Sequence, residues 1–98
     1  MAIIDVTSAG DTVLLAGIPG QQILIYSMFF QCSVTSTITF KSDTTLLSGP
    51  MAFVAGGGAN MFFDVNIPIF SCGIGESFIM NVSGLLPAVG GGFYYSQG

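Results

Sequence analysis

The stretch SVTSTITFK, residues 33–41, alternates between apolar and polar side chains. Successive side chains of an extended strand point to opposite faces, so Val34, Ser36, Ile38 and Phe40 share one face. The threonines and the lysine fall on the other face, where branched side chains suit the pleated surface. This pattern predicts an antiparallel strand with one face in a core and the other towards solvent.

Two further segments repeat the alternation. The predicted inward side chains are Phe78, Met80 and Val82 in residues 77–83, and Met61, Phe63, Val65 and Ile67 in residues 60–67. Both segments are expected to be half-buried strands that face the same core.

Turn signals separate these segments at short intervals. Residues 18–21, IPGQ, suit a type II turn because Pro19 presets the φ of the second position and Gly20 supplies the positive φ of the third. Residues 42–44 are expected to close a hairpin. The spacing indicates about eight short strands, with no segment of helical period. We therefore predict one all-β domain over residues 1–98, an antiparallel β-sandwich of jelly-roll type.

Residues 22–32 differ, because apolar side chains occur on both faces of the predicted strand. One face holds Leu24, Tyr26, Met28, Phe30 and Cys32, and the other holds Ile23, Ile25 and Phe29. The second face needs cover from a loop or from a neighbouring subunit. Aromatic residues are enriched at interface centres. The candidates for subunit contact are therefore Ile23, Ile25, Phe29, Phe93, Tyr94 and Tyr95, with a place in the core as the alternative for all six.

Ionised side chains are scarce in this sequence. Five acids and one base give a net charge of -4, and only 6% of the residues are charged, whereas typical domains are about 25% charged. A small domain keeps much of its surface outside its core, so the excess of apolar residues indicates burial against copies of the chain or a larger assembly. A single base argues against binding to nucleic acid or to an anionic membrane surface.

The composition also argues against an enzyme. The chain has no histidine, so no Ser-His or Cys-His arrangement can form. Lys41 is expected to pair with Asp43 or to contact another subunit. The other carboxylates lack the spacing of a calcium loop and are expected to be solubilising acids, with a divalent ion between subunits as the alternative; they are Asp5, Asp11, Asp64 and Glu76. We expect no cofactor.

Two cysteines are too few for a structural zinc site, which needs four ligands. Cys32 and Cys72 are expected to be buried small apolar residues, with a disulfide as the alternative. Glycine and proline interrupt the uncharged residues 12–40 and 77–98, so no membrane-spanning helix is expected. Residues 1–10 lack a basic region, so we expect the chain to stay where it is made or to leave inside a larger particle.

Six short segments carry a resemblance to a known class of proteins. They are residues 39–42 (TFKS), 47–51 (LSGPM), 56–58 (GGG), 75–78 (GESF), 81–83 (NVS) and 91–95 (GGFYY). Together they resemble small β-sandwich proteins encoded among the virion structural genes of tailed bacteriophages, over residues 13–95. Residues 68–72, PIFSC, lack the tryptophan that many of these proteins carry before the Gly-Glu turn.

The resemblance implies a structural role. It implies a non-enzymatic capsid decoration or cement subunit, made in the host cytoplasm and bound to the major capsid protein on the exterior of the virion. A homo-oligomer is expected, with a trimer favoured. Related sandwiches occur in phage tails and fibres, so a host-recognition or adaptor module is the alternative.

Overall fold

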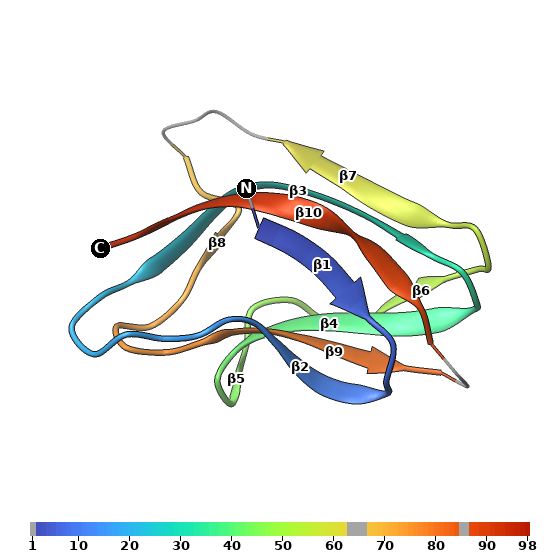
Figure 1. Ribbon diagram of the computed structural model, residues 1–98, viewed down its shortest axis with the longest axis horizontal. Helices are drawn as coiled ribbons and strands as arrows, with labels where there is room; N and C mark the ends of the chain where they lie inside the picture. The colour runs from blue at the N-terminus through green and yellow to red at the C-terminus, as the bar shows by residue number, and fades with distance from the viewer. Residues whose placement is uncertain (1, 63–66, 85–86) are drawn as a thin grey trace.

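The computed structural model describes residues 2–62, 67–84 and 87–98 (Figure 1). These residues form ten β-strands and no helix. The strands are β1 (Ala2–Val6), β2 (Gly10–Leu15), β3 (Ile23–Cys32), β4 (Ser36–Ser42), β5 (Thr45–Leu46), β6 (Met51–Phe53), β7 (Gly58–Phe62), β8 (Phe70–Ser71), β9 (Phe78–Ser83) and β10 (Val89–Gln97). No helix in the described ranges is long and apolar enough to cross a membrane.

Two antiparallel sheets lie face to face (Figure 1). Sheet A has the order β1-β10-β3-β7, and β8 also pairs with β3. Sheet B has the order β2-β9-β4-β5, and β6 also pairs with β4. Because β7 and β8 pair with different parts of β3, and β5 and β6 with different parts of β4, each of these two couples fills one strand position. The ten strands therefore occupy eight positions.

The order of these eight positions identifies the fold. Counted along the chain, the positions run 1-8-3-6 in sheet A and 2-7-4-5 in sheet B. The first thus pairs with the eighth, the second with the seventh, the third with the sixth and the fourth with the fifth. This is the connectivity of an antiparallel ribbon wrapped around a sandwich, which is the jelly roll. The predicted fold class is confirmed.

The core lies between the sheets and comes from the predicted inward faces. Ile38 and Phe40 of β4 and Phe78 of β9 are fully buried. The Phe40 and Phe78 rings are stacked with centroids 5.7 Å apart, and Phe93 of sheet A meets Phe78 edge-on at 5.5 Å. These rings join the two sheets, and aromatic pairs of this geometry contribute about 0.5–1.5 kcal/mol beyond the area they bury. The predicted alternation is confirmed for residues 36–41 and 78–83. Val34 lies in a bend before β4 and is only half-buried, so its predicted place in the core is wrong.

Strand β3 departs from the prediction because it contains a β-bulge. Tyr94 pairs with Ser27 and Tyr95 with Ile25, so Tyr26 is an extra residue on β3. An extra residue reverses the side on which all preceding side chains lie. Ile23 and Ile25 therefore point into the core with Met28, Phe30 and Cys32, and the predicted face that joined them to Phe29 is wrong. The list of core residues in this strand is Ile23, Ile25, Met28, Phe30 and Cys32.

The predicted turns are present. The amide of Gln21 donates to the carbonyl oxygen of Ile18 at 2.9 Å, and Gly20 has a φ of 78°, as a type II turn requires. Residues 43 and 44 connect Ser42 of β4 to its partner Thr45 of β5 in a two-residue hairpin.

The prediction for residues 60–67 holds in part. Asn60 is exposed on β7, as expected. Ile67 is 58% exposed and lies in a bend before Pro68, so its predicted inward position is wrong. An alternation persists only while the chain stays in the sheet, and Ile67 is outside the described strands. Residues 63–66, which include Phe63, Asp64 and Val65, lie outside the described residues.

Both cysteines are buried free thiols. Cys32 is the last residue of β3, whereas the amide of Cys72 donates to the carbonyl oxygen of Ile23, the first residue of β3. The two thiols thus lie at opposite ends of a ten-residue strand. Ten extended residues span about 30 Å, far beyond the reach of a disulfide. The predicted burial is confirmed, and burial raises the pKa of both thiols.

Candidate functional site

Exposed apolar side chains gather on the outer face of sheet A, the face turned away from sheet B. Ile3 of β1 and Phe29 of β3 lie on either side of Gly92 of β10, with which both pair. Tyr94 lies two residues beyond Gly92 and therefore points to the same face. Their exposed fractions are 75% for Ile3, 46% for Phe29 and 58% for Tyr94. We call these three residues the aromatic patch.

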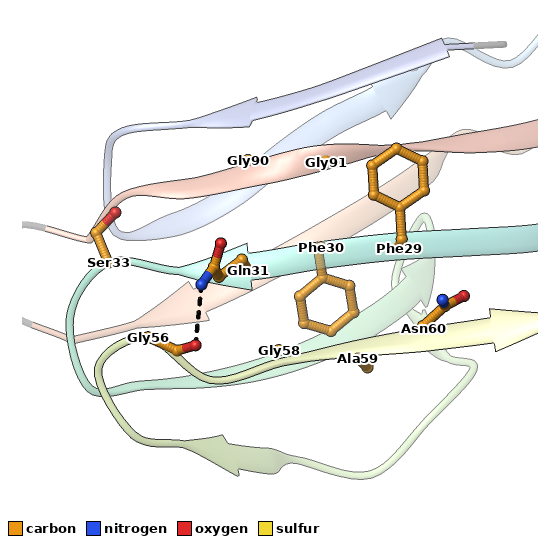
Figure 2. Close-up of a pocket in the computed structure, with 10 residues that line it drawn as sticks. All are labelled: Phe29, Phe30, Gln31, Ser33, Gly56, Gly58, Ala59, Asn60, Gly90 and Gly91. Atoms are coloured by element: carbon orange, nitrogen blue, oxygen red, sulfur yellow. Dashed lines mark hydrogen bonds between the residues drawn. The ribbon is translucent and has the colours of Figure 1, made fainter.

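A shallow groove of about 680 Å³ crosses the same face (Figure 2). Its floor contains Gly90 of β10, Gln31 of β3 and Gly58 of β7, which are partners in register across the sheet. Phe29 and Asn60, which also pair with one another, stand at one end, and Ser33 stands at the other (Figure 2). We call this feature the glycine groove. It is hollow because glycine contributes no side chain at two positions of the central row.

The glycines around the groove differ in whether the structure leaves room for a side chain. A Cβ on Gly91 would collide with the carbonyl oxygen of Phe29, and one on Gly58 would collide with that of Phe30. At these two positions, β10 and β7 therefore approach the backbone of β3 too closely for a side chain to fit. By contrast, a Cβ on Gly90 would meet nothing within 4 Å. Gly58 and Gly91 are needed for strand packing, whereas Gly90 leaves open space that a ligand could fill.

The groove is uncharged. Gln31 donates through Nε2 to the carbonyl oxygen of Gly56 at 3.0 Å, which holds the amide group in place (Figure 2). Asn60 adds a second amide side chain, and none of the lining residues is ionised. Asp5 of β1 is exposed and pairs with Gly90 at the edge of the sheet. The groove thus combines an aromatic ring, amide groups and exposed backbone, with one carboxylate on the neighbouring strand.

The six residues predicted for subunit contact lie in three places. Ile23, Ile25 and Phe93 are fully buried in the core of the chain itself. For these three residues the predicted subunit contact is wrong, and the alternative, a place in the core, is confirmed. Phe29 and Tyr94 belong to the aromatic patch. Tyr95 lies on the core side of β10, beyond the bulge, where its ring packs 5.7 Å from that of Phe93 and stays 40% exposed. Of the six candidates, Phe29, Tyr94 and Tyr95 therefore keep exposed surface that a partner could bury.

Several residues of this face were not singled out from the sequence. They are Ile3, Gln31, Asn60 and Gly90, which come from four different strands. One signal was available, because the run of glycines at 90–92 lies within β10, and glycine inside a strand indicates a bulge or a close approach of backbone. The register that brings these residues together joins segments up to about 90 positions apart in the sequence.

The outer face of sheet B carries a closed polar network. Lys41 of β4 donates to Asp11 of β2 at 2.9 Å, and Asn81 of β9, which lies between them, donates to the same carboxylate at 2.7 Å. The Asn81 hydrogen bond, followed by that of Lys41, lowers the pKa of Asp11. The predicted pairing of Lys41 with Asp43 is wrong. Asp43 follows the end of β4 with a φ of 48° and accepts instead from the amide of Ser77 at 2.9 Å.

A second polar cluster joins the loops near Ile23, at the end of β3 that is remote from the groove. The buried Ser42 hydroxyl donates to Glu76 at 2.5 Å and accepts from the amide of Gly73 at 3.0 Å. Ser77 accepts from the amide of Gly17 at 2.8 Å. These bonds satisfy groups that the loops would otherwise bury unpaired, so the cluster stabilises the end of the sandwich. Within residues 2–62, 67–84 and 87–98, no three potential metal ligands come together.

No family model, curated protein or solved structure matches this chain.

Proposed function

We propose that this chain is a non-enzymatic structural protein of a tailed-bacteriophage virion, a decoration subunit bound to the major capsid protein on the outside of the shell. The aromatic patch is the observation that carries the proposal. Ile3, Phe29 and Tyr94 present exposed apolar surface on one face of a chain with a single base. Contiguous surface of this kind marks interaction sites. The sequence resemblance supports the choice of a virion as the assembly.

The mechanism would be thermodynamic. A subunit that binds the assembled, expanded shell more tightly than its separated parts stabilises the shell by mass action. Apolar contact would supply the free energy, at about 25 cal/mol per Å² of buried apolar area before the costs of association. A well-packed sandwich suits this role because its binding face loses little conformational freedom on docking.

The proposal includes self-association, with a trimer favoured. A cyclic trimer joins two different surfaces of each subunit, unlike a twofold dimer. Exposed apolar residues are present on both outer faces, because Val13 and Leu46 of sheet B are 55% and 61% exposed. The chain therefore has exposed apolar surface on two sides.

Binding to capsids tests the proposal. The purified chain, mixed with expanded capsids that lack it, should bind at a fixed stoichiometry and raise their thermal rupture temperature. Capsids that rupture at the same temperature with and without the chain would eliminate the decoration role.

The glycine groove favours a second candidate, a tail or fibre module that recognises the host. Recognition modules need an exposed face with aromatic and polar side chains, and Phe29, Gln31 and Asn60 form such a face. Immunogold labelling of intact virions separates the two candidates, because a decoration subunit labels the shell and a fibre module labels the tail.

A further inference from the structure

The glycine groove is a shallow, open feature of about 680 Å³ that lies beside an exposed aromatic ring. Phe29 projects a ring that is 46% exposed, and Gly90 leaves the backbone open beside it. A single sugar ring could therefore rest on the floor of the groove against Phe29.

The charges around the groove restrict the class of ligand. The lining residues carry no ionised side chain, and Asp5 is the acid on the adjoining strand. Lys41, the only lysine or arginine of the chain, lies in sheet B and is bonded to Asp11. Phosphates, sulfates and acidic sugars would meet no cation in the groove, so an anionic ligand is disfavoured.

The polar groups restrict it further. Amide side chains both donate and accept hydrogen bonds, as the hydroxyl groups of a sugar require. Gln31 is held in place by its bond to Gly56, and Asn60 lies beside Phe29 (Figure 2). The C–H groups on one side of a sugar ring carry partial positive charge and suit the negative face of an aromatic ring.

We propose that the glycine groove binds a neutral oligosaccharide, with one sugar ring packed on Phe29 and its hydroxyl groups bonded to Gln31 and Asn60. The inference stands on the groove alone and does not depend on whether the chain belongs to a capsid or to a fibre. On a virion exterior, such a site would hold the particle weakly to a glycan-covered surface.

Titration by NMR tests this inference directly. The ¹⁵N-labelled full chain is titrated with cellohexaose, maltohexaose and tetra-N-acetylchitotetraose, and with polygalacturonate as an acidic counterpart. At least one neutral oligosaccharide should shift the amide signals of Gln31, Gly58, Asn60 and Gly90 in a saturable way. An affinity on the order of millimolar is expected for so open a site.

A pair of glycine substitutions supplies the variant and its control. Gly90→Leu fills the groove and should weaken oligosaccharide binding at least about tenfold. Gly49→Leu makes the same chemical change on a loop where a Cβ also meets nothing within 4 Å, and it should leave the affinity unchanged. Thermal unfolding of both variants checks that each is folded.

Four results with the saccharide probes would overturn the inference. They are the absence of shifts with all three neutral probes, shifts that map outside the groove, binding that survives Gly90→Leu, and equal binding of polygalacturonate. Shifts produced by assembled capsids alone would assign the groove to shell contact and would also overturn it. The decoration role is tested separately by capsid rupture, so either proposal can fail while the other stands.

Phe29 borders both the groove and the aromatic patch. A neighbouring subunit that covered Phe29 would therefore narrow the groove. If the aromatic patch joins subunits, oligosaccharide affinity should fall as the protein concentration rises. Gly90→Leu should block the sugar without dissociating the oligomer, so the two uses of this face can be told apart.

Discussion

On the outer face of sheet B, Asp11, Lys41 and Asn81 are bonded to one another, whereas on the outer face of sheet A Phe29 and Tyr94 leave about half of their side chains exposed. Both faces belong to the same sandwich and follow from the same two-residue period. They differ in what fills the outward positions, which are rich in threonine on β4 and in glycine on β10.

The polar groups of sheet B are bonded to one another, whereas sheet A exposes backbone and aromatic rings that a partner or ligand could contact. Branched threonines and the lysine chain cover the centre of sheet B, where the charges are paired, and the exposed apolar residues Val13 and Leu46 lie on its two edge strands. Glycine leaves sheet A hollow, so a partner or ligand can approach its backbone and the ring of Phe29. Function is therefore expected on sheet A, and sheet B serves as the reference against which that expectation can be tested.

The largest effect should come from the glycines that bring the strands of sheet A together. Gly91→Ala places a Cβ against the carbonyl oxygen of Phe29, and backbone cannot move aside as a side chain can. We expect a loss of about 3 kcal/mol or more in the free energy of unfolding. Gly90→Ala, one residue away and open to solvent, should change it by less than about 0.5 kcal/mol.

Urea denaturation of the two variants measures this difference. Equal midpoints would mean that β10 and β3 do not approach as closely as described.

The alternating strands could be predicted from the sequence because each carries its own signal. Ile38 and Phe40 repeat every second residue within one segment, and one buried face is enough to fix which way they point. Turns were predictable for the same local reason, since Pro19 and Gly20 determine the geometry of their own turn.

The side-chain orientation of β3 could not be predicted from its own residues. The bulge at Tyr26 depends on how β3 pairs with β10, whose residues lie about 70 positions later in the sequence. The pattern of residues 22–32 placed Ile25 with Phe29, and the bulge places Ile25 with Met28 instead. Phe29 and Tyr94 were predicted as contact residues, but their shared face with Ile3 and the groove beside them could not be predicted, because both features exist only once four strands are in register.

The second effect concerns association. Phe29→Asp puts a charge in the centre of the aromatic patch, and we expect the dissociation constant of the oligomer to rise about 30-fold, the size of a typical interface hot spot of about 2 kcal/mol. Val13→Asp makes the same kind of change at a similarly exposed residue of sheet B. If sheet A is the more important contact, Val13→Asp should have the smaller effect.

Light scattering during size-exclusion chromatography, over a range of concentrations, measures both variants. A larger shift towards monomer for Val13→Asp would reverse the comparison between the faces. A Phe29→Asp variant that stayed fully oligomeric would remove the aromatic patch from the subunit contact.

The smallest effect should come from the network on sheet B. Its hydrogen bonds lower the pKa of Asp11 below the value of 3.8 expected for the unfolded chain, so the folded state binds this proton less readily. The resulting stabilisation is present above the unfolded pKa and is lost as the pH falls through the folded pKa. Because Asp11 is exposed, Lys41→Met should cost only about 0.2–1 kcal/mol at neutral pH.

The pH dependence gives this small effect a distinct signature. Urea midpoints measured from neutral pH to below pH 3.8 should converge for the wild type and Lys41→Met as Asp11 becomes protonated. High salt should also reduce the difference at neutral pH, because it screens an exposed pair. A cost that stayed constant across this pH range would assign the effect to the loss of the lysine chain beside its cross-strand partner Ile79, which is 8% exposed, and not to the charge.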